Sequence, residues 1–198
     1  MRTTPVPYIA TWSEEDIPYP HVVTRPDGRG IGYADESILD RDTRGVLWDR
    51  ATGRPGGRPQ FARIHPLRQR RTMLRLLCQV CASPADRDDD GVLWVLWNRT
   101  TDWPDWPERA LVSEPPICLP CLDHALRLCP ALREGHFIIR ARSYDLYGVD
   151  GLPYSPAFPR PVPRDREIVP FSSPVIAWTL ASKLARRLGD CTVITALT

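Results

Sequence analysis

The sequence contains almost no lysine or asparagine. Lys183 is the only lysine among 26 basic residues, and Asn98 is the only asparagine. The chain also lacks any apolar run near the roughly 20 residues that a membrane-spanning helix needs. Its first residues, MRTTPVPYIATW, contain no apolar stretch long enough for a signal peptide. We therefore expect a cytoplasmic protein that contacts no membrane.

The expected compartment decides how the six cysteines are interpreted. Cytosolic thiols are kept reduced, so paired cysteine motifs there indicate a metal site before they indicate disulfides. Two CxxC motifs occur, CQVC at 78–81 and CLPC at 118–121, with 36 residues between them. Two such turns supply the four sulfur ligands of a tetrahedral zinc ion. We expect structural Zn²⁺ at Cys78, Cys81, Cys118 and Cys121, because four thiolates leave no open position for catalysis.

The composition is that of a globular protein, with 42% hydrophobic and 25% charged residues. The 22 prolines are about twice the usual share, so regular elements should be short. We predict a single α+β domain built around the zinc lobe, with irregular, proline-rich flanks. Residues 1–60 should form an irregular region with short strands, and 61–142 the zinc lobe with a preceding basic helix. Residues 143–198 should add a proline-rich segment and a C-terminal helix on the same core.

Hydrophobic spacing and breakers predict the individual elements. Helices are expected over 66–77, 117–129 and 175–188. Strands are expected over 6–12, 45–48, 92–97, 136–142 and 191–197, and an irregular surface segment over 147–164. The glycines of 25–33 favour a turn over a phosphate-binding loop, because no strong strand precedes them and no helix signal follows.

Charge is strongly segregated along the chain. Residues 41–75 carry 10 basic and 2 acidic side chains, whereas residues 1–40 carry 3 and 7 and residues 81–114 carry 3 and 8. The helix expected over 66–77 should bury Leu67, Met73, Leu74 and Leu77 and lead directly into Cys78. Clustered cations near a rigid zinc site suit phosphate, so DNA or RNA is the favoured partner. The candidate contacts are Arg63, Arg68, Arg70, Arg71 and Arg75.

Other partners and ions fit parts of the same pattern. The basic block could instead dock onto an acidic protein surface, or onto the chain's own acidic loop at 82–91. Trp103 and Trp106 could stack on bases, although packing over the zinc lobe is the simpler expectation. The DxDxDG sequence at 86–91 resembles the start of a calcium loop, but the twelfth position is Trp97 instead of glutamate, so calcium is excluded.

The order CxxC, hairpin, CxxC at the start of a helix resembles a treble-clef zinc finger over residues 76–130. The pattern LCQVC, GVLW, EPPICLPC, LCPALR is also similar to that of Arg-rich actinobacterial zinc proteins. Treble clefs occur in nucleic-acid binders, protein adaptors and some nucleases, so the resemblance implies any of the three. A nuclease of the HNH or endonuclease VII type needs a catalytic His and Asn. Here no His lies between the cysteine pairs, His65 precedes them, His124 follows them, and Asn98 is the only Asn. We therefore expect a binding module without catalysis and rank a nuclease third.

Overall fold

The computed structural model describes residues 6–18, 21–97, 105–157 and 160–197. These residues form a mixed helix and sheet structure in which strand predominates, in agreement with the predicted class at that level. No helix in these ranges is long and apolar enough to cross a membrane. The helices are α1 (Pro66–Arg75), α2 (Leu119–Leu128) and α3 (Pro130–Glu134), with 3₁₀ turns η1 (Ile38–Asp40) and η2 (Pro174–Trp178).

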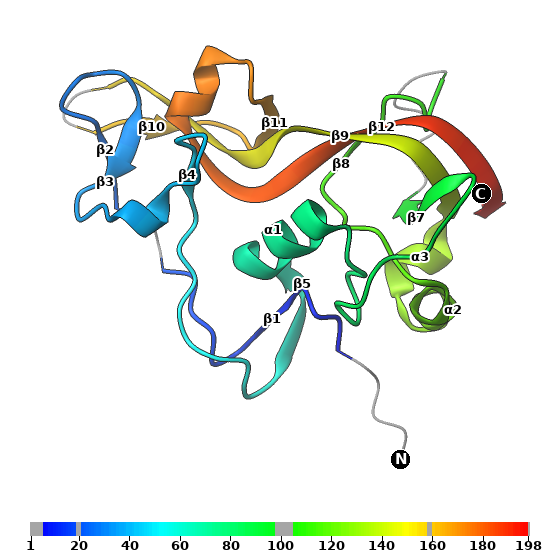
Figure 1. Ribbon diagram of the computed structural model, residues 1–198. Helices are drawn as coiled ribbons and strands as arrows, with labels where there is room; N and C mark the ends of the chain where they lie inside the picture. Colours follow the sequence, from blue (N-terminus) through cyan, green and yellow to red (C-terminus); the bar gives the residue numbers. More distant parts are fainter. Residues whose placement is uncertain (1–5, 19–20, 98–104, 158–159, 198) are drawn as a thin grey trace.

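One sheet of eight strands organises the molecule. Its main path runs β4-β12-β9-β7-β6, while β8 pairs with β12 and both β10 and β11 pair with β9. Two very long antiparallel strands, β9 and β12, arch across the structure and link its two ends (Figure 1). The strands are β4 (Leu47–Trp48), β6 (Arg87–Asp88), β7 (Gly91–Trp97), β8 (Leu111–Val112), β9 (His136–Ser155), β10 (Val162–Pro163), β11 (Glu167–Pro170) and β12 (Thr179–Leu197).

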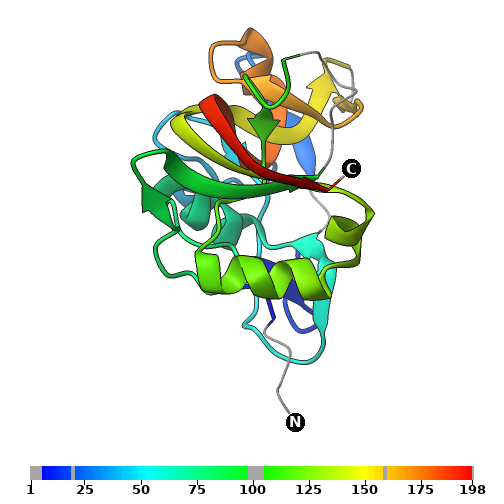
Figure 2. The ribbon, with the colours of Figure 1, turned by 90° about the vertical axis from the view of Figure 1, so that its right-hand side faces the viewer.

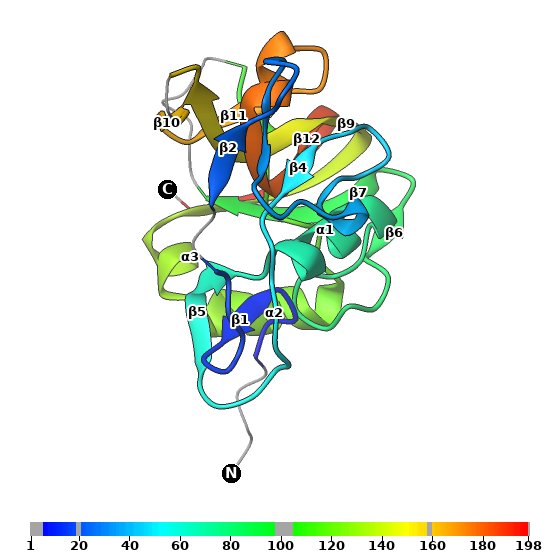
Figure 3. The ribbon, with the colours of Figure 1, turned by 90° about the vertical axis from the view of Figure 1, so that its left-hand side faces the viewer.

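Two small antiparallel pairs lie outside this sheet. The first joins β1 (Ala10–Trp12) to β5 (Pro59–Ile64), and the second joins β2 (Val22–Thr24) to β3 (Ile31–Tyr33). The β1–β5 pair lies below α1, whereas β2 lies at the opposite end of the molecule (Figure 3). The turn predicted over 25–33 is confirmed in its first part, where Gly28 and Gly30 have positive φ angles.

Most of the expected elements of the zinc lobe are confirmed. The helices predicted over 66–77 and 117–129 are α1 and α2, and the strand predicted over 92–97 is β7. The strand predicted over 136–142 is the first part of β9. In each segment the local hydrophobic period and the tertiary packing favour the same element.

The helix predicted over 175–188 is wrong. After the short turn η2, the chain enters β12 and pairs with β9 along almost its whole length. Leu180, Leu184 and Leu188 are all buried, and their spacing of four suggested a helical stripe. Because four is also a multiple of the two-residue strand period, the same spacing fits a strand equally well, and a bulge between Ala181 and Lys183 then places Leu180 and Leu184 in different core clusters. Pairing with β9 therefore decides between the two readings.

The irregular segment predicted over 147–164 is also wrong in its first half. β9 continues to Ser155 and is flanked there by β11 and β12. Gly148 and Gly151 looked like loop residues, but both lie where another strand comes very close. A Cβ atom on Gly148 would lie 2.0 Å from the Val169 carbonyl oxygen, and one on Gly151 would lie 2.5 Å from that of Leu180. These glycines permit close strand packing.

The face of α1 that is buried differs from the predicted leucine stripe. Gln69, Thr72 and Met73 are fully buried, whereas Leu67 and Leu74 are 46% and 47% exposed. The Gln69 amide bonds the backbone of β12: Nε2 donates to the Leu184 carbonyl at 2.9 Å, and Oε1 accepts from the Leu184 N–H at 2.9 Å. A polar side chain therefore fixes which side of the helix faces the sheet.

Arg186 fastens the other end of α1 to the sheet. It is 6% exposed and donates to the Met73 carbonyl through Nε at 3.0 Å and Nη2 at 2.6 Å. A third bond goes to the Tyr144 carbonyl of β9. Because the last carbonyls of a helix lack partners and carry partial negative charge, a buried guanidinium stabilises this end. Burial lowers the pKa of Arg186 from its ordinary value.

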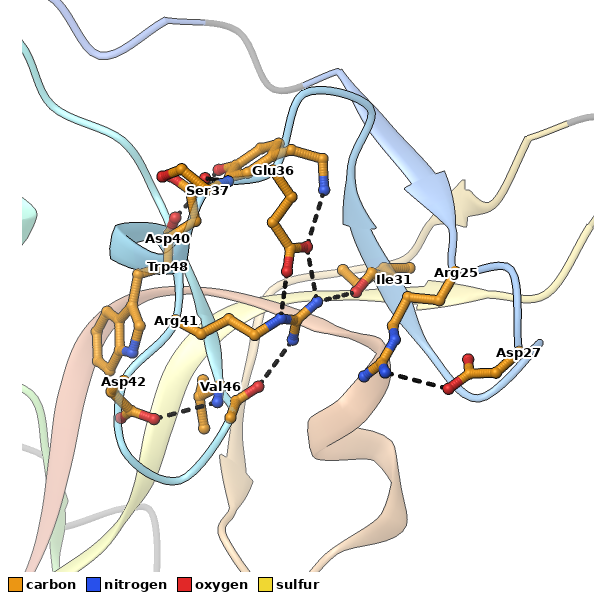
Figure 4. A network of polar contacts seen from close by, with 12 residues as sticks. Arg25, Asp27, Ile31, Glu36, Ser37, Asp40, Arg41, Asp42, Val46 and Trp48 are labelled. Carbon is orange, nitrogen blue, oxygen red and sulfur yellow. Dashed lines mark hydrogen bonds and ion pairs between the residues drawn. The ribbon is translucent and has the colours of Figure 1, made fainter.

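The acidic N-terminal block is neutralised by its immediate neighbours. Arg41 pairs with Glu36 at 2.7 Å and donates to the carbonyls of Ile31 and Gly45, as Figure 4 shows for Glu36 and Ile31. Arg50 pairs with Asp35 at 2.9 Å and Asp40 at 2.8 Å, which lowers the pKa of Asp40 to about 2. These carboxylates are therefore engaged within residues 35–50.

Candidate metal centre

The first cysteine pair lies in a tight turn at the end of α1. Leu76 ends the helix with a left-handed backbone (φ 51°), and the chain then turns back so that Leu77 bridges to Pro84. The Cys78 N–H donates to the Ser83 carbonyl at 2.7 Å, and the Val80 N–H points at the Cys78 sulfur at 3.4 Å. Backbone N–H groups directed at sulfur stabilise the thiolate form that binds metal.

The second pair lies at the start of α2. Cys118 is the N-cap residue, and Cys121, in the first turn, donates its N–H to the Cys118 carbonyl at 3.1 Å. Pro120 occupies the first turn, where a missing backbone N–H costs no helical hydrogen bond. The positive end of the helix dipole favours negative charge on these two sulfurs.

The fold brings the four cysteines together as a single cluster. All four sulfur atoms lie within 4.8 Å of one another, and the distance from Cys81 Sγ to Cys118 Sγ is 3.7 Å. Sulfurs at about 2.3 Å from a tetrahedral zinc ion are ~3.8 Å apart, whereas disulfide sulfurs are about 2.05 Å apart. All six cysteines are free of disulfides. The cluster therefore has the geometry needed to hold one metal ion.

The cluster lies between the apolar core and solvent. Cys78 is fully buried, Cys118 and Cys121 are half-buried, and Cys81 is exposed. α2 runs below the long strands on this side of the molecule (Figure 2). A separate core cluster packs around the cysteines, consisting of Leu93, Val95, Ile117, Leu122, Leu132 and Ile138. An ion held here would join the turn after α1 to the start of α2.

The thiols of the cluster differ in how readily they lose a proton. Burial raises the pKa of Cys118 and of Cys121 above the ordinary value, and interactions with neighbouring thiols add to this effect for Cys121. Burial also acts to raise the pKa of Cys81, but hydrogen bonds, chiefly from Ser83, outweigh it and lower that pKa to about 7. Four neighbouring sulfurs cannot all carry negative charge unless a cation compensates them.

Comparison with known proteins gives no family assignment. No family model, curated protein or solved structure matches the chain. The resemblance to treble clefs and to actinobacterial zinc proteins therefore gains no support from these comparisons.

Two of the five candidate arginines are engaged inside the fold. Arg68 pairs with the buried Glu15 at 2.5 and 2.7 Å and donates to the Ala10 carbonyl at 2.6 Å. Arg70 lies over the Trp48 ring at 4.6 Å, and burial lowers the pKa of its guanidinium. Both side chains hold α1 against its neighbours. Their guanidinium groups are therefore not candidates for contact with phosphate.

The Glu15–Arg68 pair should contribute measurable stability. Glu15→Gln leaves the Arg68 charge buried without its partner and should lower the unfolding free energy by about 3 kcal/mol, whereas the exposed Glu14→Gln should change it by less than about 0.5 kcal/mol. The Arg68 hydrogen bonds lower the pKa of Glu15. Its contribution is therefore present above the unfolded-state pKa and is lost as pH falls through the lower folded-state value. Urea denaturation between pH 7 and pH 3 measures both effects; equal stabilities of the two variants at pH 7 would contradict this role.

The other three candidate arginines lie at the surface. Arg63 on β5 and Arg71 and Arg75 on α1 are exposed, and none has a carboxylate partner within the described ranges. Arg71 donates to the Tyr8 hydroxyl at 2.9 Å, and Arg63 donates to Gln60 at 3.2 Å. These side chains keep most of their capacity to bind an anion.

The acidic loop at 82–91 does not neutralise α1. Asp86 and Asp88 pair with Arg140, the latter at 2.9 Å, and Asp90 pairs with Arg142 at 2.6 Å. The β6–β7 hairpin packs against β9, which supplies both arginines. The alternative in which the basic block docks onto this loop is therefore wrong for the described arginines of α1.

The remaining candidate residues lie apart from the sulfur cluster. His65 is buried at the start of α1, with Nε2 3.8 Å from Glu15, and His124 has a buried Nε2 that lacks a partner among the described residues. Trp106 packs edge-on against Phe137 at 4.4 Å, in the core cluster of β7, β8 and β9 instead of over the zinc lobe. Asn98 and Trp103 lie outside the described residues.

Two further exposed arginines, which were not among the sequence-predicted contacts, lie in the glycine- and proline-rich segment before β5. Arg54 and Arg58 have no carboxylate partner among the described residues. Arg58 immediately precedes β5 and is two residues from the ladder partner of Thr11. The signal that could have found them was the excess of basic side chains over 41–75.

Proposed function

We propose that this chain is a zinc-stabilised, non-catalytic binding module with a treble-clef arrangement, and that its partner is nucleic acid. The sulfur spacing supports zinc, because four thiolates in tetrahedral proximity match its preferred structural site. The order of turn, β6–β7 hairpin and helix α2 supports the treble-clef arrangement. The ion would be structural, since all four positions of its shell are occupied by cysteine.

One observation carries the choice of partner. The arginines of the basic block divide into those that pair with a carboxylate or lie within 4.9 Å of an aromatic ring centroid, and those that do neither. Arg71 belongs to the second group, although it bonds the Tyr8 hydroxyl and lies 5.6 Å from that ring. Arg41, Arg50 and Arg68 pair with carboxylates, and Arg44 and Arg70 lie over aromatic rings. The remaining five have no carboxylate partner within the described ranges, and we call them the open arginines: Arg54, Arg58, Arg63, Arg71 and Arg75.

The open arginines come from two elements that meet at the N-terminal segment. Arg54, Arg58 and Arg63 lie before or within β5, which pairs with β1. Arg71 of α1 bonds Tyr8, which lies two residues before β1. Guanidinium groups bind phosphate oxygens in a bidentate geometry. Several of them together increase the affinity for a polyanion, because binding releases its condensed counterions.

Salt dependence tests this proposal. We expect the protein to bind a fluorescently labelled oligonucleotide, with log affinity falling linearly against log salt at a slope steeper than about −3 if the open arginines each neutralise a phosphate. Fluorescence anisotropy between 50 and 300 mM potassium chloride gives that slope. Absence of binding at the lowest salt, or a slope near zero, would refute a nucleic-acid partner.

A protein partner is the second candidate because α1 exposes apolar surface beside its cations. Leu67 and Leu74 are about half-exposed on the same side of the helix as Arg71 and Arg75. Phosphate groups make no favourable contact with leucine side chains. An acidic amphipathic segment of another protein would contact both the leucines and the arginines. Leu67→Ser with Leu74→Ser separates the two: it should leave oligonucleotide affinity within about twofold if nucleic acid is the partner.

A further inference from the structure

The strand β5 contains a large irregularity that holds an exposed aromatic ring. Thr11 pairs with Gln60, but the next residue towards the N-terminus, Ala10, pairs with Ile64. The three residues between them, 61–63, leave the ladder and are all exposed. We call them the β5 bulge. Strand bulges re-aim side chains and are common beside functional sites.

Phe61 projects from this bulge and is 58% exposed. Exposing a phenyl ring leaves apolar surface in water, and burying it would yield hydrophobic free energy. Arg58 precedes the ring by three residues and Arg63 follows it by two, and both are open arginines. No acidic residue lies between Arg50 and the end of α1. The ring is therefore flanked by cations along the strand. In the fold the Glu14 side chain lies against Gly56 and Gly57 but forms no ion pair with Arg58.

We propose that the β5 bulge binds single-stranded nucleic acid, with the Phe61 ring stacking on one unpaired base and Arg58 and Arg63 contacting the phosphates beside it. This inference rests on the proposed nucleic-acid partner and names its class. An aromatic face with flanking cations suits an unpaired strand, because every base offers a flat face once it leaves the duplex stack. A duplex hides those faces and presents phosphates alone to the same surface.

The N-terminal segment extends the same surface towards α1. The Tyr8 ring lies 5.6 Å from the Arg71 guanidinium, and Arg71 also donates to its hydroxyl. β1, which begins two residues later, forms the ladder with β5. A strand bound at Phe61 could therefore continue past Tyr8 to Arg71 and Arg75, and figures 1 and 3 both place β5 beside α1.

The test compares a 15-nucleotide oligo(dT) with a 15-base-pair duplex as probes for the full chain. Phe61→Leu removes the ring but keeps an apolar side chain, and Phe61→Trp enlarges the stacking face. We expect Phe61→Leu to weaken oligo(dT) binding by about 5- to 100-fold and to leave duplex binding within about twofold, whereas Phe61→Trp should match or exceed the parent. Ile38→Ala, at a side chain that is 91% exposed, is the matched control and should change neither affinity.

The outcomes separate this inference from the proposed function. Salt-dependent binding that is equal for both probes and insensitive to Phe61→Leu overturns the stacking platform but leaves a phosphate-binding module. Equal losses for both probes also overturn it. Binding of neither probe removes both proposals. Because Phe61 is largely exposed, its variants should keep the parent's melting temperature and metal content, and those two measurements confirm that the folded protein is being compared.

Discussion

Chelation of the metal should unfold the zinc lobe. Structural zinc contributes about 10–16 kcal/mol in small finger peptides, which is comparable to the roughly 5–15 kcal/mol stability of a whole domain. The four cysteines join the end of α1 to the start of α2, and loss of the ion would remove this link between the two helices. We expect one zinc per chain by elemental analysis, and loss of amide protection across residues 76–130 when a strong chelator is added.

Single substitutions separate ligands from other cysteines. Cys81→Ser and Cys121→Ser should each remove the metal and greatly lower the melting temperature. Cys129→Ser and Cys191→Ser, which lie outside the cluster and are half-buried, should keep one zinc per chain and cost only a few kcal/mol. If metal-free protein melts at the same temperature as the purified protein, zinc does not stabilise the fold and this prediction is wrong.

The metal should also be released as the pH falls. Thiols bind zinc only in the deprotonated form, so protons compete with the ion. Burial raises the pKa of Cys118 and Cys121, so protons compete strongly for these two sulfurs. We therefore expect the zinc-bound state to be lost at acidic pH. Native mass spectrometry between pH 7.5 and pH 4.5 follows this release directly, on the same samples that are used for elemental analysis.

Reversal of two charges on α1 should strongly weaken nucleic-acid binding. Arg71→Glu with Arg75→Glu replaces two open arginines by carboxylates on a surface that would face phosphate. Each lost phosphate contact reduces the salt slope by about 1, so the double variant should lower the slope by about 2 and the affinity by at least about tenfold at moderate salt. Fluorescence anisotropy over a salt series provides both values.

A matched variant controls for the change in net charge. Arg29→Glu with Arg160→Glu makes the same change at two exposed arginines that have no carboxylate partner among the described residues, on the β2–β3 turn and before β10. This control should alter affinity only about twofold, through the overall field of the protein, which salt screens. If both double variants weaken binding equally, net charge and not the surface of α1 governs the interaction.

Much of the region around the cysteine cluster could be predicted because its signals are local. The spacing within CQVC and CLPC requires two tight turns, and Pro120 fits the first turn of a helix. The buried strand around Leu93 and Val95 is short, apolar and bounded by Gly91. In these segments the residues that predict the element are the same residues that stabilise it.

The long strands could not be predicted because their signals depend on distant partners. Leu180, Leu184 and Leu188 satisfy both a helical and a strand period, and only the pairing of β12 with β9 distinguishes the two. Gly148 and Gly151 indicate a loop until the neighbouring backbones of β11 and β12 are in place. The burial of Gln69, instead of Leu67, follows from backbone groups of β12 that lie 115 residues away.

The sequence by itself determined that four cysteines occur as two CxxC pairs and that the chain carries a concentrated block of arginine. Only the tertiary structure decided which arginines remain available, because Glu15, Asp35, Asp40 and Trp48 reach their partners through folding. The physical reason is how far apart in the sequence the interacting residues lie. A turn that presents two thiolates is set by neighbouring residues, whereas the free capacity of a charge depends on every side chain that the fold brings to it.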